Sequence, residues 1–225
     1  MTLHYNTISP NLLSTLRKFM QDETFKEFRL VGGTALALQL GHRISVDIDL
    51  FTDREYGTMD LSSITHFFKK NFTIADGLDT LTTTAPGYTI YCGDNKDNLV
   101  KVDLYYTDSF LFPPVIDDNL RISDIRDIAA MKILAISNST RGKDFWDIHE
   151  LMNTFALDDI INFGLQRFPY GLDRDNVISI LSNIPVESIE PSINSLNGDY
   201  WEFVAEDIIE EATKLLTQQH CHKAK

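Results

Sequence analysis

The sequence predicts an α+β fold in which a mixed α/β half is followed by a helical half. Segments that alternate with the period of a β-strand are confined to roughly the first hundred of the 225 residues. The sequence pattern changes at Pro113 and Pro114, and beyond them apolar residues recur with helical spacing. We therefore expect a boundary within 110–118, with domains at 1–112 and 113–225.

The first half alternates between predicted helices and predicted strands. Ser9 is suited to cap a helix that has Pro10 in its first turn and Leu12, Leu16 and Phe19 on its apolar face. Next we expect a short strand at 28–31, a helix at 34–40 that ends at Gly41, a strand at 46–51, a helix at 61–68, and strands at 88–92 and 100–106.

The second half carries only helical patterns, and we expect helices at 123–137, 143–155, 158–168, 173–184 and 200–216. Residues 198–211 contain six carboxylates and no Lys or Arg, which is typical of a solvated helix face. We find no internal repeat.

Composition and charge exclude several classes of protein. Hydrophobic residues make up 43% and charged residues 24%, as in ordinary globular proteins. Lys and Arg number 20 against 33 Asp and Glu, and the net charge of −13 argues against a protein that coats DNA regardless of sequence, although a local basic groove stays open. No apolar stretch is long enough to span a membrane, and the N-terminus does not resemble a signal peptide. Because Cys92 and Cys221 are isolated, we expect a cytoplasmic protein without a disulfide framework.

Two aspartates in the predicted strand at 46–51 suggest a metal site. Asp47 and Asp49 are two residues apart, so their side chains share one face, while Ile48 and Leu50 face the core. Two carboxylates about 4 Å apart repel by about 4 kcal/mol at an effective dielectric near 20. A divalent cation relieves that repulsion, and Mg²⁺ prefers such oxygen ligands. The alternative is an edge strand with an acidic, solvated face.

A glycine pair precedes these aspartates and suggests a phosphate site. Gly32 and Gly33 follow an apolar strand and begin a helix, where main-chain N–H groups and the helix dipole favour an anion. Thr34 could add a hydroxyl donor, and Arg43 and Ser45 share strand parity with Asp47. The alternative is a plain strand-to-helix turn. Together, a phosphate turn and a carboxylate pair make a site for a nucleoside triphosphate.

A third carboxylate is available for two-metal phosphoryl transfer. Asp103 shares strand parity with Lys101, while Val102 and Leu104 face the other way. The same pattern also fits a half-exposed strand without a catalytic role.

The helical half adds charged candidates. Lys132 interrupts an apolar helix and could place a point charge on a triphosphate or extend to solvent at the helix margin. Asp144 and Asp147 are neighbours on a helix, where one could act as a base or hold Lys132 or Arg141. Arg141 and Lys143 could hold phosphate or belong to a solvated turn. We interpret His149 as a surface or core histidine, and His220, Cys221 and His222 as a tail.

Several motifs occur in the order of a known superfamily. G-G-T, S-V-D-I-D-L-F and K-V-D-L resemble the nucleotidyltransferase superfamily that includes DNA polymerase β. A-A-M-K-I-L-A-I and R-G-K-D-F-W-D-I-H-E-L narrow this to a resemblance to the AbiEii/AbiGii family of bacterial nucleotidyltransferase toxins, effectors of toxin–antitoxin and abortive-infection systems. The resemblance runs from about Leu30 to Leu151.

The resemblance implies a role for each matching residue. It places phosphate binding on Gly32, Gly33 and Thr34 and metal binding on Asp47 and Asp49, with Asp103 at a less fixed position. Lys132 matches the motif lysine of the family, and Asp144 and Asp147 match its last acidic motif. The catalytic set implied by motif and residue chemistry is Asp47, Asp49, Asp103, Lys132, Asp144 and Asp147. The nucleotide-binding set consists of Gly32, Gly33, Thr34, Arg43, Ser45, Lys132, Arg141 and Lys143.

The resemblance also implies an architecture and an activity. We expect a nucleotidyltransferase-like core with a mixed sheet, a helical bundle after it, and an active site in the cleft between them. The expected reaction moves a nucleoside monophosphate from an NTP to an acceptor hydroxyl, with Mg²⁺ as cofactor. The acceptor implied is tRNA or another component of translation, and the implied protein partner is a cognate antitoxin.

Two other functions stay open. One is an inactive module that binds nucleotide and a partner. The other is a small-molecule nucleotidyltransferase, which the net charge of −13 favours. A contiguous basic surface would favour a nucleic acid acceptor instead, and its candidate members are Arg43, Lys101, Lys132, Arg141 and Lys143.

Overall fold

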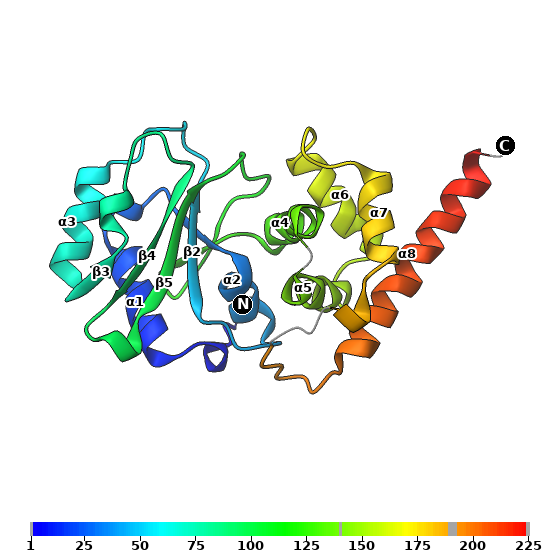
Figure 1. Cartoon of the computed structure of the whole chain (residues 1–225), viewed down its shortest axis with the longest axis horizontal. Coiled ribbons are helices and arrows are strands. Elements are labelled where there is room, and N and C mark those ends of the chain that lie inside the picture. Colours follow the sequence, from blue (N-terminus) through cyan, green and yellow to red (C-terminus); the bar gives the residue numbers. More distant parts are fainter. Residues whose placement is uncertain (1, 140, 189–192, 224–225) are drawn as a thin grey trace. The chain divides into compact units, whose positions relative to one another are not determined.

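The computed structural model describes residues 2–139, 141–188 and 193–223, without the side chains of 219–223. The chain forms two compact units, Met1–Asp124 and Ile125–Lys225 (Figure 1). This division falls later than residue 112, where the proline pair suggested a boundary. The reason is that two short strands follow the prolines and join the sheet of the first unit, where Leu30 pairs with Ile122.

A mixed sheet forms the first unit. Seven strands among the described residues lie in the order β3 (Ile74–Asp76), β4 (Gly87–Gly93), β5 (Val100–Tyr106), β2 (Asp47–Thr52), β1 (Arg29–Val31), β7 (Leu120–Ile122) and β6 (Val115–Asp117). The β2–β5 and β1–β7 pairs are parallel, and the other pairs are antiparallel. The predicted α+β class is confirmed, although β3, β6 and β7 were not expected because each has only three residues.

The helices of the first unit have clear end signals, of which Ser9 and Gly41 were predicted and Asp60 was not. Ser9 caps α1 (Pro10–Gln21), with its Oγ 3.1 Å from the Leu12 nitrogen. The second helix, α2 (Gly32–Leu40), ends at Gly41, which has a φ of 76°. Asp60 caps α3 (Leu61–Asn71) by accepting bonds from two main-chain N–H groups. Short 3₁₀ turns are η1 (Tyr5–Thr7), η2 (Glu23–Phe25), η3 (Leu78–Thr80) and η4 (Lys96–Asn98).

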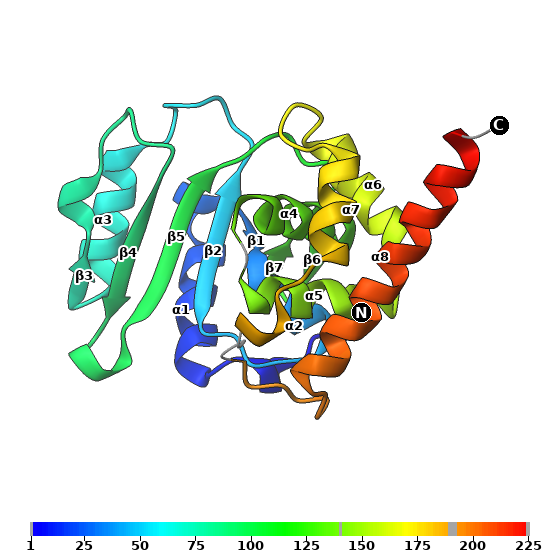
Figure 2. The same ribbon diagram turned by 45° about the vertical axis from the view of Figure 1, so that its right-hand side comes forward.

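The two faces of the sheet differ. Along β2 and β5 the even-numbered residues are buried, except Tyr106 at the end of β5, and the odd-numbered residues are partly exposed. Figure 2 shows α1 and α3 on one face of the sheet. A cluster of phenylalanines accompanies these two helices and η2, and its members are Phe19, Phe25, Phe28, Phe67, Phe68 and Phe72. The apolar core therefore fixes the strand parity that turns Asp47 and Asp49 to the other face.

The second unit is helical, as the pattern predicted. Its helices are α4 (Ile125–Asn138), α5 (Gly142–Met152), α6 (Leu157–Arg167), α7 (Arg174–Ser182) and α8 (Trp201–Lys223), with a short turn, η5 (Val186–Ser188). Close packing of α4 and α6 depends on Gly164, where a Cβ atom would lie 2.8 Å from Cγ2 of Ile133. Arg167 and Asp127 add a fully buried ion pair at 3.2 Å between the same helices.

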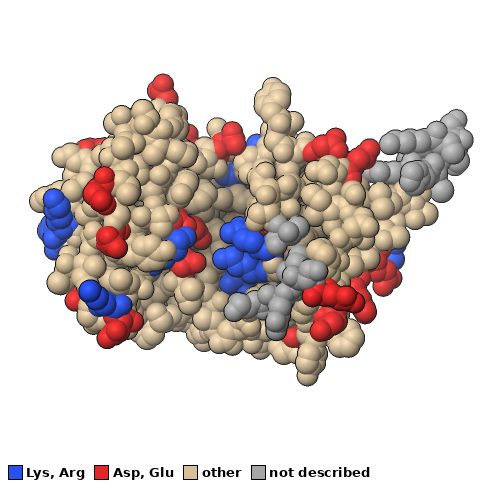
Figure 3. Space-filling view, in the orientation of Figure 1, with Lys and Arg blue, Asp and Glu red and all other residues tan. Residues whose placement is uncertain are grey.

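The acidic run lies on α8 and is solvated, as expected. Glu202, Glu206, Asp207 and Glu210 are exposed, and Figure 3 shows carboxylates gathered near the start of this helix. Lys214 bonds to Glu210 and Glu211, and His149 lies 3.0 Å from Asp207. The side chains of His220, Cys221 and His222 lie outside the described residues. No described helix is both long enough and apolar enough to cross a membrane.

Candidate active site

The candidate carboxylates lie side by side on β2 and β5. In the parallel register, Asp49 is opposite Asp103 and Asp47 is opposite Lys101. Asp47, Asp49 and Asp103 are partly exposed, and Asp49 and Asp103 each lie between two buried apolar neighbours on their strand. We call Asp47, Asp49 and Asp103 the acid row. Their grouping depends on a strand register that joins segments more than fifty residues apart, as the paired numbers show.

The glycine pair contacts the acid row and a cation. Gly32 has a φ of 68°, and a Cβ atom there would lie 2.2 Å from Oδ2 of Asp49. A Cβ atom on Gly33 would lie 2.3 Å from Nη2 of Arg43 and 3.4 Å from Oγ of Ser45. The absence of side chains at 32 and 33 thus admits one carboxylate and one guanidinium to the start of α2. A helix start with an arginine beside it favours an anion such as phosphate.

Thr34 ties α2 to the segment that enters β2. Its hydroxyl lies 2.8 Å from the hydroxyl of Ser45 and also donates to the main-chain oxygen of Asp47. Thr34 and Ser45 are both buried. These bonds hold the helix start against the acid row, while a direct bond from Thr34 to phosphate stays a prediction.

Asp103 is oriented by two donors. Its Oδ1 accepts a hydrogen bond from Oγ1 of Thr89 at 2.6 Å, and its Oδ2 accepts one from Nζ of Lys101. Burial lowers the pKa of Lys101, but the bond to Asp103 and the charges of Asp47 and Asp49 outweigh this, so the pKa lies above its ordinary value. Lys101 is therefore charged, and with the three aspartates it gives the group a net charge of −2 when all are ionised.

The carboxylates of the acid row are suited to Mg²⁺ that also binds phosphate and water, rather than to a metal ion held by protein ligands alone. Among the residues that the structure describes, no three His, Cys, Asp or Glu side chains are arranged to hold a metal ion by themselves. Mg²⁺ is usually bound by one or two carboxylates together with substrate phosphates and water. Asp47 and Asp49, beside the Gly32–Gly33 turn, supply that set. Both oxygens of Asp103 are engaged, so its service as a third ligand stays a prediction.

Three charged candidates of the helical unit, Lys132, Asp144 and Asp147, form a buried network, which Arg141 joins from the surface. Nζ of Lys132 lies 2.7 Å from Oδ1 of Asp144 and 2.6 Å from Oδ2 of Asp147. Arg141 bonds to the other oxygen of Asp144 at 2.8 Å. The Lys132 side chain is 8% exposed, and those of Asp144 and Asp147 are 1% and 0% exposed. Two cations thus balance two carboxylates and join α4 to α5.

The exposed members of the predicted set lie at the start of α5. Arg141 immediately precedes the helix and its side chain is 55% exposed, while Lys143 is exposed in the first turn. The predicted site residues are therefore divided between the two units. Gly32, Asp47, Asp49 and Asp103 are grouped in the first, and Lys132 belongs to the network of the second. That both groups serve a single cleft stays a prediction.

The structure adds residues that the sequence did not single out. Thr89 reaches Asp103 because β4 pairs with β5 and places Thr89 opposite Asp103. Lys101 was expected only on the same strand face, and it proves to bond directly to Asp103. The available sequence signal was strand parity, but the pairing of β4 with β5 cannot be read from either strand alone.

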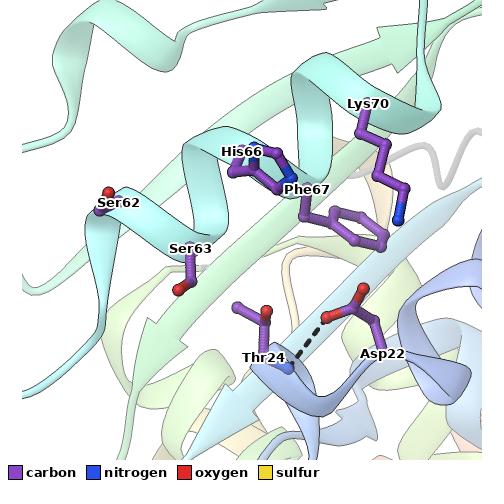
Figure 4. Close-up of a pocket in the computed structure, with 7 residues that line it drawn as sticks. All are labelled: Asp22, Thr24, Ser62, Ser63, His66, Phe67 and Lys70. Atoms are coloured by element: carbon purple, nitrogen blue, oxygen red, sulfur yellow. Dashed lines mark hydrogen bonds between the residues drawn. The ribbon is translucent and has the colours of Figure 1, made fainter.

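A separate pocket of about 340 Å³ lies between α3 and η2, neither of which carries a member of the acid row. Figure 4 shows its lining, with Ser62, Ser63, His66, Phe67 and Lys70 on α3 facing Asp22 and Thr24. Asp22 accepts a bond from the Thr24 nitrogen at 3.0 Å and so caps η2. Its carboxylate therefore has a structural role.

Known structures share the fold of this chain. JHP933 from Helicobacter pylori has a similar fold, with a TM-score of 0.57, 19% identity and coverage of 96% of this chain and 98% of that chain. MenT4, a nucleotidyltransferase toxin from Mycobacterium tuberculosis H37Rv, gives a TM-score of 0.54 at 12% identity, over 90% of this chain and 83% of that chain. At such low identity these structures show a shared fold.

Sequence comparison reaches further. A protein of Aquifex aeolicus (strain VF5), aq_aa25, is 28% identical over 134 residues, which are 59% of this chain and 61% of that protein. The sequence pattern of one family matches residues 14–212. This match places the protein in a family of nucleotidyltransferases. The chain belongs to the AbiEii family, the nucleotidyltransferase toxins of type IV toxin–antitoxin systems.

Proposed function

We propose that the protein transfers a nucleoside monophosphate from an NTP to a hydroxyl group of RNA, with tRNA as the first acceptor to test, and that it requires Mg²⁺. We further propose that a cognate antitoxin restrains this activity. The observation that carries the proposal is the contact between Gly32 and Asp49, which joins a phosphate-binding turn to the acid row. A carboxylate pair beside a helix start is suited to a metal–triphosphate complex.

The chemistry divides between the two sides of the acid row. Asp47 and Asp49 would hold Mg²⁺, which supplies Lewis-acid stabilisation of charge on the phosphate oxygens. The start of α2 and Arg43 bind the triphosphate. The acceptor hydroxyl releases its proton to solvent water as its oxygen forms a bond to the α-phosphorus. The bond from that phosphorus to the oxygen that bridges the α- and β-phosphates breaks, and pyrophosphate leaves with its charge balanced by Arg43.

Asp103 and the helical unit have supporting roles in this proposal. Thr89 and Lys101 aim Asp103 next to Asp49, where it would complete the metal cluster once Lys101 is displaced. Lys132 engages Asp144 and Asp147 and acts as a positioning residue that fixes α5. Arg141 and Lys143, at the exposed start of that helix, would bind phosphate groups.

A transfer assay tests the proposal directly. Purified full-length protein is incubated with total bacterial tRNA, MgCl₂ and each of the four α-³²P-labelled NTPs in turn, and the RNA is resolved on a denaturing gel. We expect label from at least one NTP to enter the RNA, and chelation by EDTA to abolish it. Label in a small molecule with none in RNA would instead favour a small-molecule acceptor.

Two variants make the assay specific to the acid row. An Asp47→Asn/Asp49→Asn double variant keeps the size of both side chains and removes both charges. Asp76→Asn changes an exposed acid of β3 in the same sheet. We expect the double variant to lose at least about a thousandfold in rate, since removal of one strong electrostatic contact costs about 10²–10³, and Asp76→Asn to match the wild type. Equal labelling by the double variant would contradict the proposal.

A further inference from the structure

The strands that carry the acid row continue into a row of aromatic groups. Two residues beyond Asp49 and Asp103, Phe51 is opposite Tyr105 in the same parallel register. Arg29 of β1 is opposite Phe51. Since directly paired residues share a sheet face, Phe51, Tyr105 and Arg29 lie on the face that carries the carboxylates. We call these three residues, with Phe110, the aromatic row.

Contacts within the aromatic row hold flat groups beside one another. The ring centroids of Phe51 and Tyr105 are 5.6 Å apart. The guanidinium carbon of Arg29 lies 4.1 Å from the ring centroid of Phe110, and its Nη1 donates to the main-chain oxygen of Phe112 at 2.7 Å. The four residues of the row are all partly exposed. Solvent therefore reaches a line of π-faces and a guanidinium plane.

A glycine in the neighbouring strand makes room for Tyr105. Gly87 of β4 is opposite Tyr105. A Cβ atom on Gly87 would lie 2.3 Å from Cγ and Cδ1 of Tyr105, so the ring rests over the main chain of β4. The ring is thus set by the sheet itself. A ring fixed in this way loses little conformational entropy when a flat ligand stacks on it.

The aromatic row lies on the far side of the acid row from the phosphate-binding turn. Arg43 and Ser45, which contact Gly33, precede Asp47 in the chain, whereas Phe51 follows Asp49. Along β2 the order is therefore phosphate turn, carboxylates, aromatic row. In phosphoryl transfer the attacking and leaving oxygens lie roughly in line across the phosphorus. With pyrophosphate leaving at the turn, the attacking hydroxyl arrives from the aromatic side.

From this order we propose that the aromatic row binds, by stacking, the nucleobase of the acceptor nucleotide that carries the receiving hydroxyl. The inference rests on the proposed transfer to RNA and names the part of the site that holds the acceptor. Aromatic rings and arginine planes are the groups on which proteins stack unpaired bases. Phe51 and Tyr105 are binding residues in this proposal, and Arg29 extends the surface toward Phe110.

Steady-state kinetics test the assignment, with the concentrations of tRNA and NTP varied separately. The variants Phe51→Leu and Tyr105→Leu keep an apolar side chain and remove the ring, while Tyr105→Phe keeps the ring. Base stacking is worth about 1–3 kcal/mol, so we expect each leucine variant to raise KM for tRNA by about tenfold or more with KM for NTP unchanged. Because it keeps the ring, Tyr105→Phe should raise KM for tRNA less than Tyr105→Leu does, and Tyr56→Leu, which removes an exposed aromatic outside the row, should match the wild type.

A binding measurement separates this proposal from the proposed reaction, because it needs no transfer. The probes are a short fluorescein-labelled adenosine oligoribonucleotide and the same oligonucleotide with an abasic 3′ end, titrated by fluorescence anisotropy. We expect Phe51→Leu and Tyr105→Leu to weaken binding of the intact probe about tenfold and to leave the abasic probe unaffected. Thermal unfolding of each variant verifies that it is folded.

Three results would overturn the assignment. A rise in KM for NTP alone would place the base of the NTP on the row. Equal losses with the intact and abasic probes, or no loss with either, would show that the row does not read a base. A different result would contradict only the proposed reaction. If the wild type transfers no nucleotide yet binds the intact probe through the row, the proposed reaction fails while the base-binding surface stands.

Discussion

The Asp49 carboxylate lies beside Gly32 in the space that a side chain at position 32 would need, since a Cβ atom on residue 32 would lie 2.2 Å from Oδ2 and 2.9 Å from Cγ of Asp49. The main chain at Gly32 also has a φ of 68°, which L side chains rarely adopt. Both the close approach and the left-handed conformation require glycine here. The position of the Gly32–Gly33 turn beside the Asp49 carboxylate thus depends on a single residue.

Gly32→Ala should therefore damage the carboxylate more than the turn. We expect the methyl group to push Asp49 out of the acid row and to lower kcat at least about a hundredfold, in the range seen when an active-site electrostatic contact is lost. The left-handed φ adds about 1–2 kcal/mol of strain. Transfer kinetics over a range of Mg²⁺ concentrations, with a urea unfolding curve, measure both effects.

Gly33→Ala is the matched control. Its methyl group would meet the far end of the Arg43 side chain, which can move, so we expect KM for NTP to rise with little loss of stability. Identical Mg²⁺ and NTP dependence in the two alanine variants would contradict the distinct contacts assigned to the two glycines.

Lys101→Met should strengthen metal binding. Lys101 bonds to Asp103 and neutralises part of the acid row. Without it the net charge of the group formed by the acid row and residue 101 changes from −2 to −3. One additional unit of uncompensated charge is worth about 1–4 kcal/mol at about 4 Å, so we expect the Mn²⁺ dissociation constant to fall by about tenfold. Titration calorimetry with Mn²⁺ measures this, and unchanged or weaker binding would show that Lys101 does not compete with the metal.

The buried network around Lys132 predicts a stability effect. Lys132→Met leaves Asp144 and Asp147 without their ammonium partner at 1% and 0% exposure. Removing one member of a buried ion network costs about 3–5 kcal/mol. Urea unfolding followed by tryptophan fluorescence is suited to the measurement, because Trp146 and Trp201 both lie in the second unit.

Lys214 supplies the control for this measurement. It also bonds to two carboxylates, Glu210 and Glu211, but its side chain is 51% exposed. Surface ion pairs contribute little, so Lys214→Met should leave the unfolding midpoint almost unchanged. An equal loss for both variants would argue that burial of the Lys132 network does not matter.

Cys92 should be inert in the folded protein. Burial raises the pKa of its thiol from 9.0 to about 12, so at pH 9 only about one native molecule in a thousand carries the reactive thiolate. The thiol stabilises the fold below pH 9, and this contribution is lost as the pH rises from 9 to 12, because the unfolded thiol ionises first. Iodoacetamide labelling of a Cys221→Ser variant tests this. Rates at pH 9 equal to those in urea would contradict it.

The site was only partly predictable from the sequence. The D-x-D alternation placed Asp47 and Asp49 on one face, and Gly32–Gly33 marked the start of a helix, because these are local properties of one segment. The partners of Asp103 were not predictable, since Thr89 and Lys101 reach it through register and side-chain geometry. Phe51 and Tyr105 carried a usable signal, as each lies two residues beyond an acid on the same strand.

The fold shows the same limit. Long amphipathic helices were located from their period, but β6 and β7 have three residues each and too little pattern to detect. A turn signal was available between them in Asp118 and Asn119, since Asp and Asn favour tight hairpin turns. In the structure these two residues have φ values of 46° and 61°. For Lys132 the sequence left a triphosphate, solvent or a pair with Asp144 open, and in the structure Asp144 and Asp147 engage it.

The most direct test of the central claim is metal rescue at Asp49. In an Asp49→Cys variant, the hard carboxylate is replaced by a soft thiolate, which binds Mg²⁺ poorly and Cd²⁺ or Mn²⁺ better. We expect nucleotide transfer to RNA to be lost with Mg²⁺ and to return in part when Cd²⁺ or Mn²⁺ is added. Transfer by Asp49→Cys at the wild-type rate with Mg²⁺ alone would contradict a metal contact at Asp49.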